Sequence, residues 1–493
     1  TFGNAAGSTL WAWGMVVLAT VVCLPVEAAE VQRPNLVVIL ADDLGWSDTS
    51  LYGTSQLHQT PNVQRLAARG ITFTRAYSAS PLCSPTRASI LTGQTPARHG
   101  STAPNHHLAV ERLAASVKPQ APPGDKARQV ESVTRLDTRL PTLGKLLRTA
   151  GWRTGHFGKW HLGHEPYSPL EHGFEIDVPH TPGPGPAANF VAPWAFDHFS
   201  PRVGGEHIED RMASEAAAWM ESVCDQPFFL QYWAFSVHAP FDAKASLIDD
   251  SREAIDPAAV QNSPTYAAMV HSLDDAVGTL LDTIDRLGIA DNTIIVFTSD
   301  NGGNGYNAIR ERAADGTPYT AVPTSNQPLR GGKATVYEGG IRIPQVVVWP
   351  GVAKPGSRTD ARTQSTDLYP TLLAAAGVAT PAEHVIDGVD IRPAIAGEPF
   401  DRGPTFTFFP HAPGVPDWLP PSVAVHQDRW KLIRLFHQGE EGRHAWQLYD
   451  LAADQGEQQD CAAAHPEVVA ELDSLIEAHL QDAQAVVPLP NPR

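Results

Sequence analysis

Three long, largely apolar runs constrain the fold of this 493-residue chain more than any other feature of its sequence. They span residues 35–40, 228–237 and 293–299. Polar residues follow each run: Asp42 and Asp43 after the first, His238 after the second, and Asp300 and Asn301 after the third. Such runs are typical of strands buried on both faces of a parallel sheet. Because ligands bind beyond the carboxyl ends of strands in open α/β sheets, we expect these polar residues to share one site.

Helical signals alternate with these strand signals. Before the third run, apolar residues recur at helical spacing, namely Met269, Val270, Leu273, Val277, Leu280, Ile284 and Leu287. After about Pro404 the pattern changes to short strands at 423–425, 429–434 and 447–451, followed by a helix at 466–480. We therefore expect an α/β fold, with a large mixed, mostly parallel sheet sandwiched by helices in residues 33–400. A smaller antiparallel-sheet α+β subdomain should occupy residues 401–493.

The acidic and amide pairs indicate a cation site. Asp42, Asp43, Asp300 and Asn301 offer oxygen donors, which suit a hard divalent cation such as calcium or magnesium better than zinc. A single Asp-Asp pair after a strand is more often a turn or a helix cap. Two such pairs at matching strand ends favour the cation site.

The segment Cys83-Ser84-Pro85-Thr86-Arg87 predicts the start of a helix that ends at Gly93. Proline is favoured at the first helical position, and glycine commonly ends a helix. Residue 83 would then lie at a helix N-terminus, where free N–H groups and the helix dipole attract anions. Arg87, one turn along, adds a fixed positive charge. The alternative is a buried structural cysteine that caps an ordinary helix.

This segment resembles the signature of the type I, formylglycine-dependent sulfatases, a family of the alkaline phosphatase superfamily. Residues 155–163, with Lys159 and His161, look like the lysine and histidine segment of that family, and residues 331–344, with Lys333, look like its second lysine segment. The resemblance covers five motifs from Asn35 to the C-terminus and is arylsulfatase-like or N-acetylgalactosamine-sulfatase-like. It implies an alkaline-phosphatase-like fold and hydrolysis of sulfate esters.

The resemblance also implies a cofactor and a modified residue. Cys83 would be oxidised to formylglycine (3-oxoalanine) by a formylglycine-generating enzyme or an equivalent maturase. The cation, calcium rather than magnesium, would be held by Asp42, Asp43, residue 83, Asp300 and Asn301. One hydroxyl of the aldehyde hydrate would attack sulfur and pass its proton to Asp300.

Further roles follow from the same resemblance. Arg87, Lys159 and Lys333 would neutralise the sulfate oxygens, as expected for a loose transition state. His238, helped by Lys333, would protonate the departing alcohol, and Lys159, His238 and Lys333 would contact the substrate. His161 would take the proton of the second hydroxyl. The structural alternatives are surface lysines in glycine-rich loops and hydrogen-bonded structural histidines.

Charge limits the partners. The chain carries 36 Lys and Arg residues against 54 Asp and Glu residues, a net charge of -18. This argues against nucleic acid or an anionic membrane as partner, and it requires a sulfate-cleaving site to carry its own positive pocket.

Residues 1–28 resemble a secretory signal peptide, because an apolar stretch from Leu10 to Pro25 precedes a small-residue cleavage sequence. The alternative is a single membrane anchor, but the stretch is shorter than a bilayer span. We therefore expect no stable membrane span in the mature chain and a secreted or periplasmic location. Cys23 has no assigned role. Cys224 and Cys461 could pair or remain two separate thiols.

The substrate is the least constrained inference. We expect a sulfated saccharide rather than a small aryl sulfate, with possible sugar contacts from His106, His107, Trp194, Arg310, Arg312 and His411 in loops near the motifs. One alternative function is a phosphomonoesterase or phosphodiesterase of the same superfamily, although those relatives usually present Thr or Ser and hold two zinc ions. Another is a sulfated-glycan-binding protein without turnover.

Overall fold

The computed structural model describes residues 1–9, 33–55 and 57–492. Residues Thr1–Gln32 and Arg33–Arg493 are separate units, and every described helix and strand belongs to the second. The apolar part of the predicted signal peptide, Leu10 to Pro25, and Cys23 within it lie outside the described residues. None of the helices in the described ranges combines the length and the apolar character that a bilayer crossing demands.

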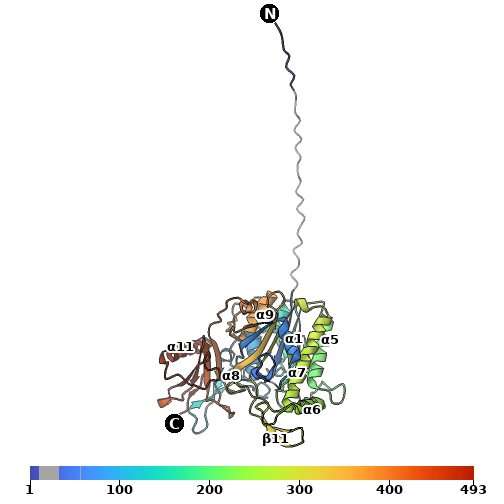
Figure 1. Ribbon diagram of the computed structural model, residues 1–493. Coiled ribbons are helices and arrows are strands. Elements are labelled where there is room, and N and C mark those ends of the chain that lie inside the picture. The colour runs from blue at the N-terminus through green and yellow to red at the C-terminus, as the bar shows by residue number, and fades with distance from the viewer. Residues whose placement is uncertain (10–32, 56, 493) are drawn as a thin grey trace. The chain divides into compact units, whose positions relative to one another are not determined.

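A nine-stranded sheet, counted over the described residues, forms the centre of the second unit (Figure 1). β1 (Asn35–Ala41) lies between β9 (Thr293–Ser299) and β8 (Phe228–Trp233) and runs parallel to both. The parallel set continues through β6 (Arg153–Gly158) and β7 (Ile176–Val178). On the other side, β12 (Arg342–Val348) is antiparallel to β9 and to β2 (Ile71–Tyr77), and β13 (Ser357–Thr359) and β14 (Thr363–Gln364) pair in parallel with β2. The predicted mixed, mostly parallel sheet is confirmed.

Both faces of β1 are buried in apolar cores. Val37, Ile39 and Ala41 contribute to the core on one face, whereas Leu36, Val38 and Leu40 contribute to the core on the other. Successive side chains of a strand point to opposite faces, so an uninterrupted apolar run is what a strand covered twice requires.

Helices cover the two faces as separate layers. The first layer comprises α1 (Pro61–Arg69), α5 (Ile208–Val223), α6 (Ala245–Glu253) and α7 (Pro264–Arg286). The second comprises α2 (Cys83–Thr92), α4 (Leu143–Thr149), α9 (Leu368–Ala376) and α10 (Arg392–Ala396). Figure 1 shows α5 and α7 side by side, with α9 on the far side of the strands. α7 buries the predicted helical positions from Met269 to Ile284, which confirms that prediction.

Two predicted boundaries are wrong. The strand expected over 228–237 ends at Trp233, because the backbone N–H groups of Phe235 and Ser236 donate to the buried carboxylate of Glu209, at 2.8 and 2.7 Å, instead of extending the ladder. α2 begins at Cys83, so Pro85 is its third residue rather than its first. Residue 83 still lies at the helix N-terminus, and Gly93 ends the helix with a φ of 70°.

A smaller antiparallel sheet follows the main one along the chain. It consists of β15 (Thr405–Phe409), β16 (Ser422–Gln427), β17 (Trp430–Leu435) and β18 (Ala445–Asp450), and α11 (Pro466–Asp482) packs on one face (Figure 1). β15 was not expected from the sequence. The other face of this sheet packs against Leu82, Ala334, Val336 and Tyr337. The small sheet therefore lies directly behind the residues that flank Cys83 and Lys333.

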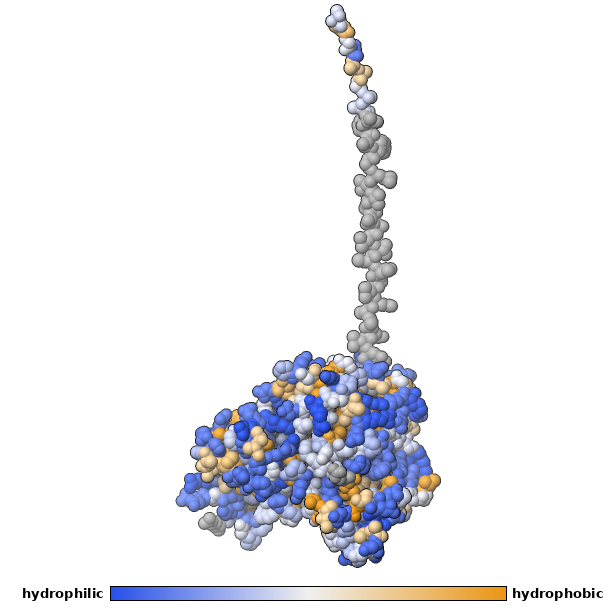
Figure 2. Space-filling view, in the orientation of Figure 1, coloured by the Kyte–Doolittle hydropathy of each residue, from blue (hydrophilic) through white to orange (hydrophobic). Residues whose placement is uncertain are grey.

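The remaining elements are short. They are α3 (Pro96–His99), α8 (Glu338–Ile341), the paired strands β10 (Ile309–Arg312) and β11 (Pro318–Ala321), β3 (Ser116–Val117) and β5 (Val130–Glu131), β4 (Ala127–Arg128) and β19 (Leu489–Pro490), and the 3₁₀ helices η1 (Trp46–Asp48), η2 (Pro169–His172), η3 (Ala290–Asn292), η4 (Ser365–Asp367) and η5 (Glu440–Gly442). Cys224 and Cys461 are both free thiols, so the alternative of two separate thiols holds. Most of the face seen in Figure 2 is hydrophilic, with hydrophobic residues in small groups.

Candidate active site

Adjacent parallel strands bring the predicted acidic pairs together. Asp42 and Asp43 follow β1, and Asp300 and Asn301 follow β9, its neighbour in the sheet. The backbone N–H of Asp43 donates to Asp300 Oδ1 at 3.1 Å, and Asn301 Nδ2 donates to Asp43 Oδ1 at 2.8 Å. All four side chains are buried.

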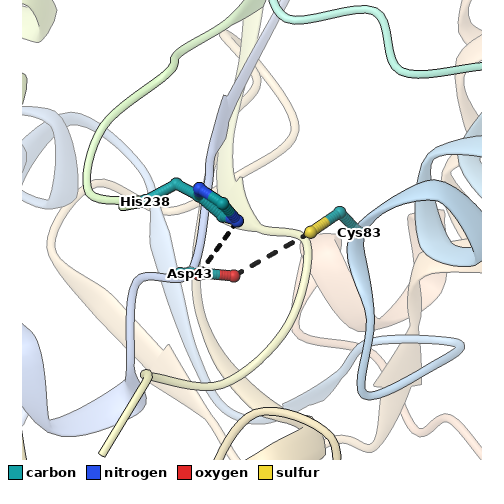
Figure 3. Close-up of side chains that lie close together, drawn as sticks. All are labelled: Asp43, Cys83 and His238. Carbon is teal, nitrogen blue, oxygen red and sulfur yellow. Dashed lines mark hydrogen bonds and ion pairs between the residues drawn. The ribbon is translucent and has the colours of Figure 1, made fainter. Parts of the chain in front are cut away.

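Residue 83 joins this acidic cluster from α2. One ligand atom each from Asp42, Asp43, Cys83 and Asp300 lies within 4.8 Å of the others. Figure 3 shows the carboxylate of Asp43 between Cys83 and His238. The Cys83 Sγ is 3.9 Å from Asp43 Oδ1, and His238 Nε2 is 3.7 Å from Asp43 Oδ2.

Three cationic side chains balance the three carboxylates. Lys159 Nζ donates to Asp42 Oδ2 at 2.6 Å, and Lys333 Nζ donates to Asp43 Oδ2 at 2.6 Å. Arg87 donates through Nη2 and Nε to Asp300 Oδ2, at 2.8 and 3.0 Å. Buried charges need such pairing, because the desolvation of an unpaired ion costs several kcal/mol. The formal charges of these six side chains cancel, so a bound divalent cation would give the cluster a surplus of two positive charges toward an anion.

The position of Arg87 is fixed by two further contacts. Its Nη1 donates to the backbone oxygen of Lys159 at 2.7 Å, and its guanidinium lies 5.1 Å from the ring centroid of Trp233, the last residue of β8. The side chain is fully buried. Such a rigid, permanently charged group is suited to binding oxyanions.

The carboxylates next to residue 83 differ in their proton affinity. Burial opposes the ionisation of Asp43, but the charges of Lys333, His238 and Lys159 outweigh it and hold the pKa of Asp43 well below its usual range. Burial, together with the neighbouring charge of Asp42, raises the pKa of Asp300 to about 6 despite Arg87. Burial also raises the pKa of the Cys83 thiol to about 12, against the opposing charges of Lys159 and Lys333.

His238 presents one ring nitrogen to the cluster. Its Nδ1 lies 2.6 Å from the backbone oxygen of Ala239, and because a carbonyl only accepts, Nδ1 carries the proton. Nε2 faces Asp43. Burial and the charge of Lys333 lower the pKa of His238 to about 3, against the opposing effect of Asp43.

His161 contacts a second histidine. Its Nε2 is 3.0 Å from Nδ1 of His107, whose side chain reaches solvent. The backbone oxygen of His161 accepts a hydrogen bond of 2.7 Å from Ser84 Oγ, next to residue 83. Burial and the charge of Lys159 hold the pKa of His161 well below its usual range.

The donor set fits a hard cation. Among the described residues, Asn301 Oδ1 and Asp42 Oδ1 are buried oxygens without a hydrogen bond, and Asp42 Oδ1 lies 3.5 Å from Arg87 Nη2. Buried oxygens without partners are costly, so these two atoms mark where a cation would be stabilised. Carboxylate and amide oxygens are the ligands that calcium and magnesium take.

The residues predicted to contact a sugar differ in their burial and do not form one group. His106 is buried and its Nε2 is 3.2 Å from Ser101 Oγ, while the buried Trp194 belongs to one of the two main apolar cores. Arg310 and Arg312 point to solvent from β10. His411 is half-buried with its Nε2 3.0 Å from Thr102 Oγ1. His107 reaches the site through His161.

The contacts of His161 with His107 and of Arg87 with Trp233 were not foreseen. His107 is 54 residues from its partner, and no local pattern pairs them. The adjacent histidines at 106 and 107 were the available signal. The aromatic residue at the end of β8 gave none.

Comparison with known proteins places this chain among described families. The family model described as "Sulfatase" matches residues 34–378, and the model described as "N-sulphoglucosamine sulphohydrolase, C-terminal" matches residues 332–485. The N-acetylgalactosamine-6-sulfatase of Canis lupus familiaris is 33% identical over 397 residues, which cover 76% of this chain and 69% of the relative.

Two further relatives extend over most of the chain. Human arylsulfatase A is 30% identical over 498 residues, covering 91% of this chain and 88% of that protein. The crystal structure of Ps i-CgsB in complex with k-i-k-neocarrahexaose has a TM-score of 0.72 and 26% identity, and covers 92% of this chain and 94% of that one.

Proposed function

The chain belongs to the sulfatase family, and from this premise we propose that it hydrolyses sulfate monoesters of a saccharide on a formylglycine formed from Cys83. The observation that carries the proposal is the cluster of Asp42, Asp43, Cys83 and Asp300 atoms within 4.8 Å, paired with Arg87, Lys159 and Lys333. The cluster combines a site for a hard cation with three fixed positive charges around one residue at a helix N-terminus. Such a site suits the anionic group of a sulfate ester.

Calcium is the proposed ion. Asp42, Asp43, Asp300, Asn301 and the modified residue 83 would hold it, and it would polarise the oxygen atoms bound there. The two buried oxygens without hydrogen bonds, on Asp42 and Asn301, support this assignment.

Formylglycine at position 83 would supply a hydrated aldehyde as the nucleophile. Cys83 is free, faces Asp43, and begins α2, all of which suit a reactive group held beside a cation. The conversion requires a formylglycine-generating enzyme or an equivalent maturase as a partner.

The surrounding residues would position the ester and move protons. Arg87, Lys159 and Lys333 would bind sulfate oxygens and neutralise the charge on them. His238 Nε2 would hold the proton for the departing alcohol oxygen, because the negative charge of a bound sulfate favours the protonated ring and offsets the effect of Lys333. His161 would accept a proton beside residue 83, with its ring orientation fixed by His107.

A saccharide is the proposed alcohol component. The relatives include sulfatases named for N-acetylgalactosamine, in Canis lupus familiaris and in Bacteroides thetaiotaomicron, and the structural neighbour bound to k-i-k-neocarrahexaose. These relatives are 33%, 28% and 26% identical to this chain, which supports the class of substrate rather than one sugar.

We also propose that residues 1–28 are a signal peptide, that the protein is secreted or periplasmic, and that 33–400 and 401–493 are a catalytic domain and a subdomain. The apolar stretch from Leu10 to Pro25 supports the first two proposals, and the separate sheet β15–β18 supports the third. N-terminal sequencing of the protein after cell fractionation would test the signal peptide. An N-terminus upstream of residue 28 would contradict it.

The decisive experiment compares sulfate and phosphate monoesters with and without a chelator, on protein whose mass at position 83 is known. We expect turnover of sulfate esters that is lost with chelator, regained with calcium, and absent in Cys83→Ala. Turnover confined to phosphate esters would favour the phosphatase alternative. An unmodified Cys83 in natively produced protein, with saccharide binding but no turnover, would favour the binding protein.

A further inference from the structure

A large cleft adjoins the proposed sulfate site at Lys333. The cleft has a volume of about 820 Å³ and is lined by Gly331, Gly332 and Lys333, as well as by Tyr306. Lys333 Nζ is the group that donates to Asp43. Burial raises the pKa of Tyr306, and the charges of Lys333, Asp43 and Cys83 also affect it.

The cleft is larger than the sulfate site needs. Of the residues that would hold the sulfate group around Cys83, which is 1% exposed, Lys333 is the one that also lines the cleft. Part of the lining comes from the C-terminal part of the chain, through Pro416, Asp417, Gly456 and Gln458. A volume of this size is at the upper end of the range for small-molecule sites. It leaves room for a part of the substrate beyond the sulfated group.

Arg330 is a second cationic residue in the lining of the cleft, besides Lys333. Its Nη1 donates to the backbone oxygen of Glu457 at 3.0 Å and to Tyr449 Oη at 3.3 Å, and its Nε lies 3.5 Å from Asp417 Oδ1. The guanidinium stacks 4.0 Å from the ring centroid of Tyr337. The side chain is nevertheless 30% exposed, so a fixed positive charge faces the cleft.

Apolar side chains are exposed near the same opening. Val260 and Val322 line the cleft and are 54% and 38% exposed. Trp418 is 55% exposed and directly follows the lining residue Asp417, although it does not itself belong to the lining. An aromatic ring beside polar groups is the surface that a sugar ring can use, because it offers both an apolar face and hydrogen-bonding edges.

We propose that this cleft is a subsite for the sugar unit next to the sulfated one, and that Arg330 binds an anionic group on that neighbouring unit. The proposal rests on the sulfatase function above and specifies its substrate as a sulfated oligosaccharide with a carboxylate or a second sulfate on the adjoining sugar. Asp417 and Glu457 hold Arg330 in place, and Trp418 packs against the sugar ring.

The test compares kcat/KM for a small aryl sulfate with kcat/KM for sulfated oligosaccharides whose neighbouring unit is neutral, carboxylated or sulfated. In Arg330→Met, we expect the ratio of oligosaccharide to aryl sulfate kcat/KM to fall about tenfold for anionic neighbours and much less for the neutral one, since hydrogen bonds to charged groups are the stronger ones. The matched control is Arg429→Met. Arg429 also pairs with an aspartate, Asp450, and lies 5.7 Å from the ring centroid of Trp430, but it does not line the cleft.

Two outcomes would overturn the subsite. One is an equal fall for aryl sulfate and oligosaccharides in Arg330→Met, and the other is an equal fall for neutral and anionic neighbours. If Arg330→Met fails to fold, Trp418→Ala supplies the test: binding of the oligosaccharide to Cys83→Ala protein, measured by calorimetry, should weaken when Trp418→Ala is added, and unchanged affinity would refute the contact. Absence of sulfate ester turnover in the wild type would instead refute the proposed function itself.

Discussion

At the scale of single residues, His107 makes a contact with the proposed site that its position in the sequence did not predict. It reaches solvent on one side and touches Nε2 of the buried His161 on the other. This position fits an orienting role rather than the sugar contact expected from its place in a loop. Loss of the ring would leave a buried nitrogen unpaired, at a cost of about 1–3 kcal/mol.

We therefore expect His107→Ala to lower kcat roughly tenfold with little change in KM, corresponding to about 1.4 kcal/mol of barrier height. His107→Gln should retain most of the rate, because its amide can still pair with the imidazole of His161. Steady-state kinetics on an aryl sulfate would measure both. A selective rise in KM on saccharides would restore the sugar-contact interpretation.

His180 provides a pH-dependent prediction away from the site. Its hydrogen bond to the buried Asp177, with Nδ1 2.7 Å from Oδ2, raises the pKa of His180 to about 8 although burial opposes this. A folded-state pKa above the unfolded value of about 6.5 stabilises the fold below pH 6.5, and the benefit disappears as the pH rises through 8.

The comparison is between the wild type and His180→Asn, since asparagine tolerates the positive φ of 64° at this position. The difference in free energy of unfolding should be largest near pH 6 and should vanish near pH 9. Groups elsewhere cancel in the difference. A difference that grows with pH would contradict the assignment.

At the scale of elements, the loop after β9 and the short helix α8 approach closely at glycines. Gly302 N donates to Gly340 O at 2.9 Å, and a Cβ on Gly302 would lie 1.9 Å from Gly339 O. Gly302 directly follows Asp300 and Asn301, so any displacement here moves two proposed cation ligands.

Gly302→Ala should cost about 1–3 kcal/mol of stability, as overpacking does, and should lower sulfate ester turnover more than tenfold through the displaced ligands. Gly204→Ala is the control, because a Cβ there meets no atom within 4 Å. Urea unfolding and kcat would be measured together. If Gly302→Ala kept the stability and the kcat of the wild type, the loop after β9 and α8 would be able to separate without effect on the site.

The elements also show what the sequence could and could not predict. The bounds of β9 match the predicted 293–299 exactly, and β1 matches closely, because an apolar run covered on both faces leaves a direct record in the sequence. The end of β8 was missed, since Phe235 and Val237 are as apolar as the strand itself. Only the buried carboxylate of Glu209, supplied by α5, decides where the ladder stops.

The proposed site was predicted by a different route. Lys159 and Asp42 are 117 residues apart and Lys333 and Asp43 are 290 apart, so no periodicity links them. The family motifs predicted these residues, and the geometry brings them together. The C-terminal sheet packs one face against Leu82 and Ala334. This packing depends on three-dimensional contacts that no local sequence pattern encodes.

At the scale of the whole molecule, a buried ionic network joins the small sheet to α8. Lys431 of β17 contacts Glu338 of α8 at 3.1 Å and Glu457 at 2.7 Å, and all three side chains are fully buried. His426 of β16 also contacts Glu338, with Nε2 2.9 Å from Oε1. The network therefore holds α8 in place, and α8 belongs to the segment 331–344 that contains Lys333.

Lys431→Met should lower the free energy of unfolding by about 3–5 kcal/mol, because it removes the cation that contacts two buried carboxylates, Glu338 and Glu457. Lys354→Met, at an exposed lysine, should stay within about 0.5 kcal/mol of the wild type. Adding Glu457→Gln to Lys431→Met should recover part of the loss, since one uncompensated charge is removed. Equal stability of the two lysine variants in urea unfolding would contradict the network.

The burial of residue 83 determines when the proposed oxidation of Cys83 could take place. Cys83 is 1% exposed and every residue of α2 is buried, so a second enzyme could not reach this side chain once the chain has folded. The proposed maturase would therefore have to act before folding is complete, on a nascent or still unfolded polypeptide. Overproduction that outpaces the maturase would then yield molecules that are correctly folded yet permanently inactive, and supplying the maturase afterwards would not repair them.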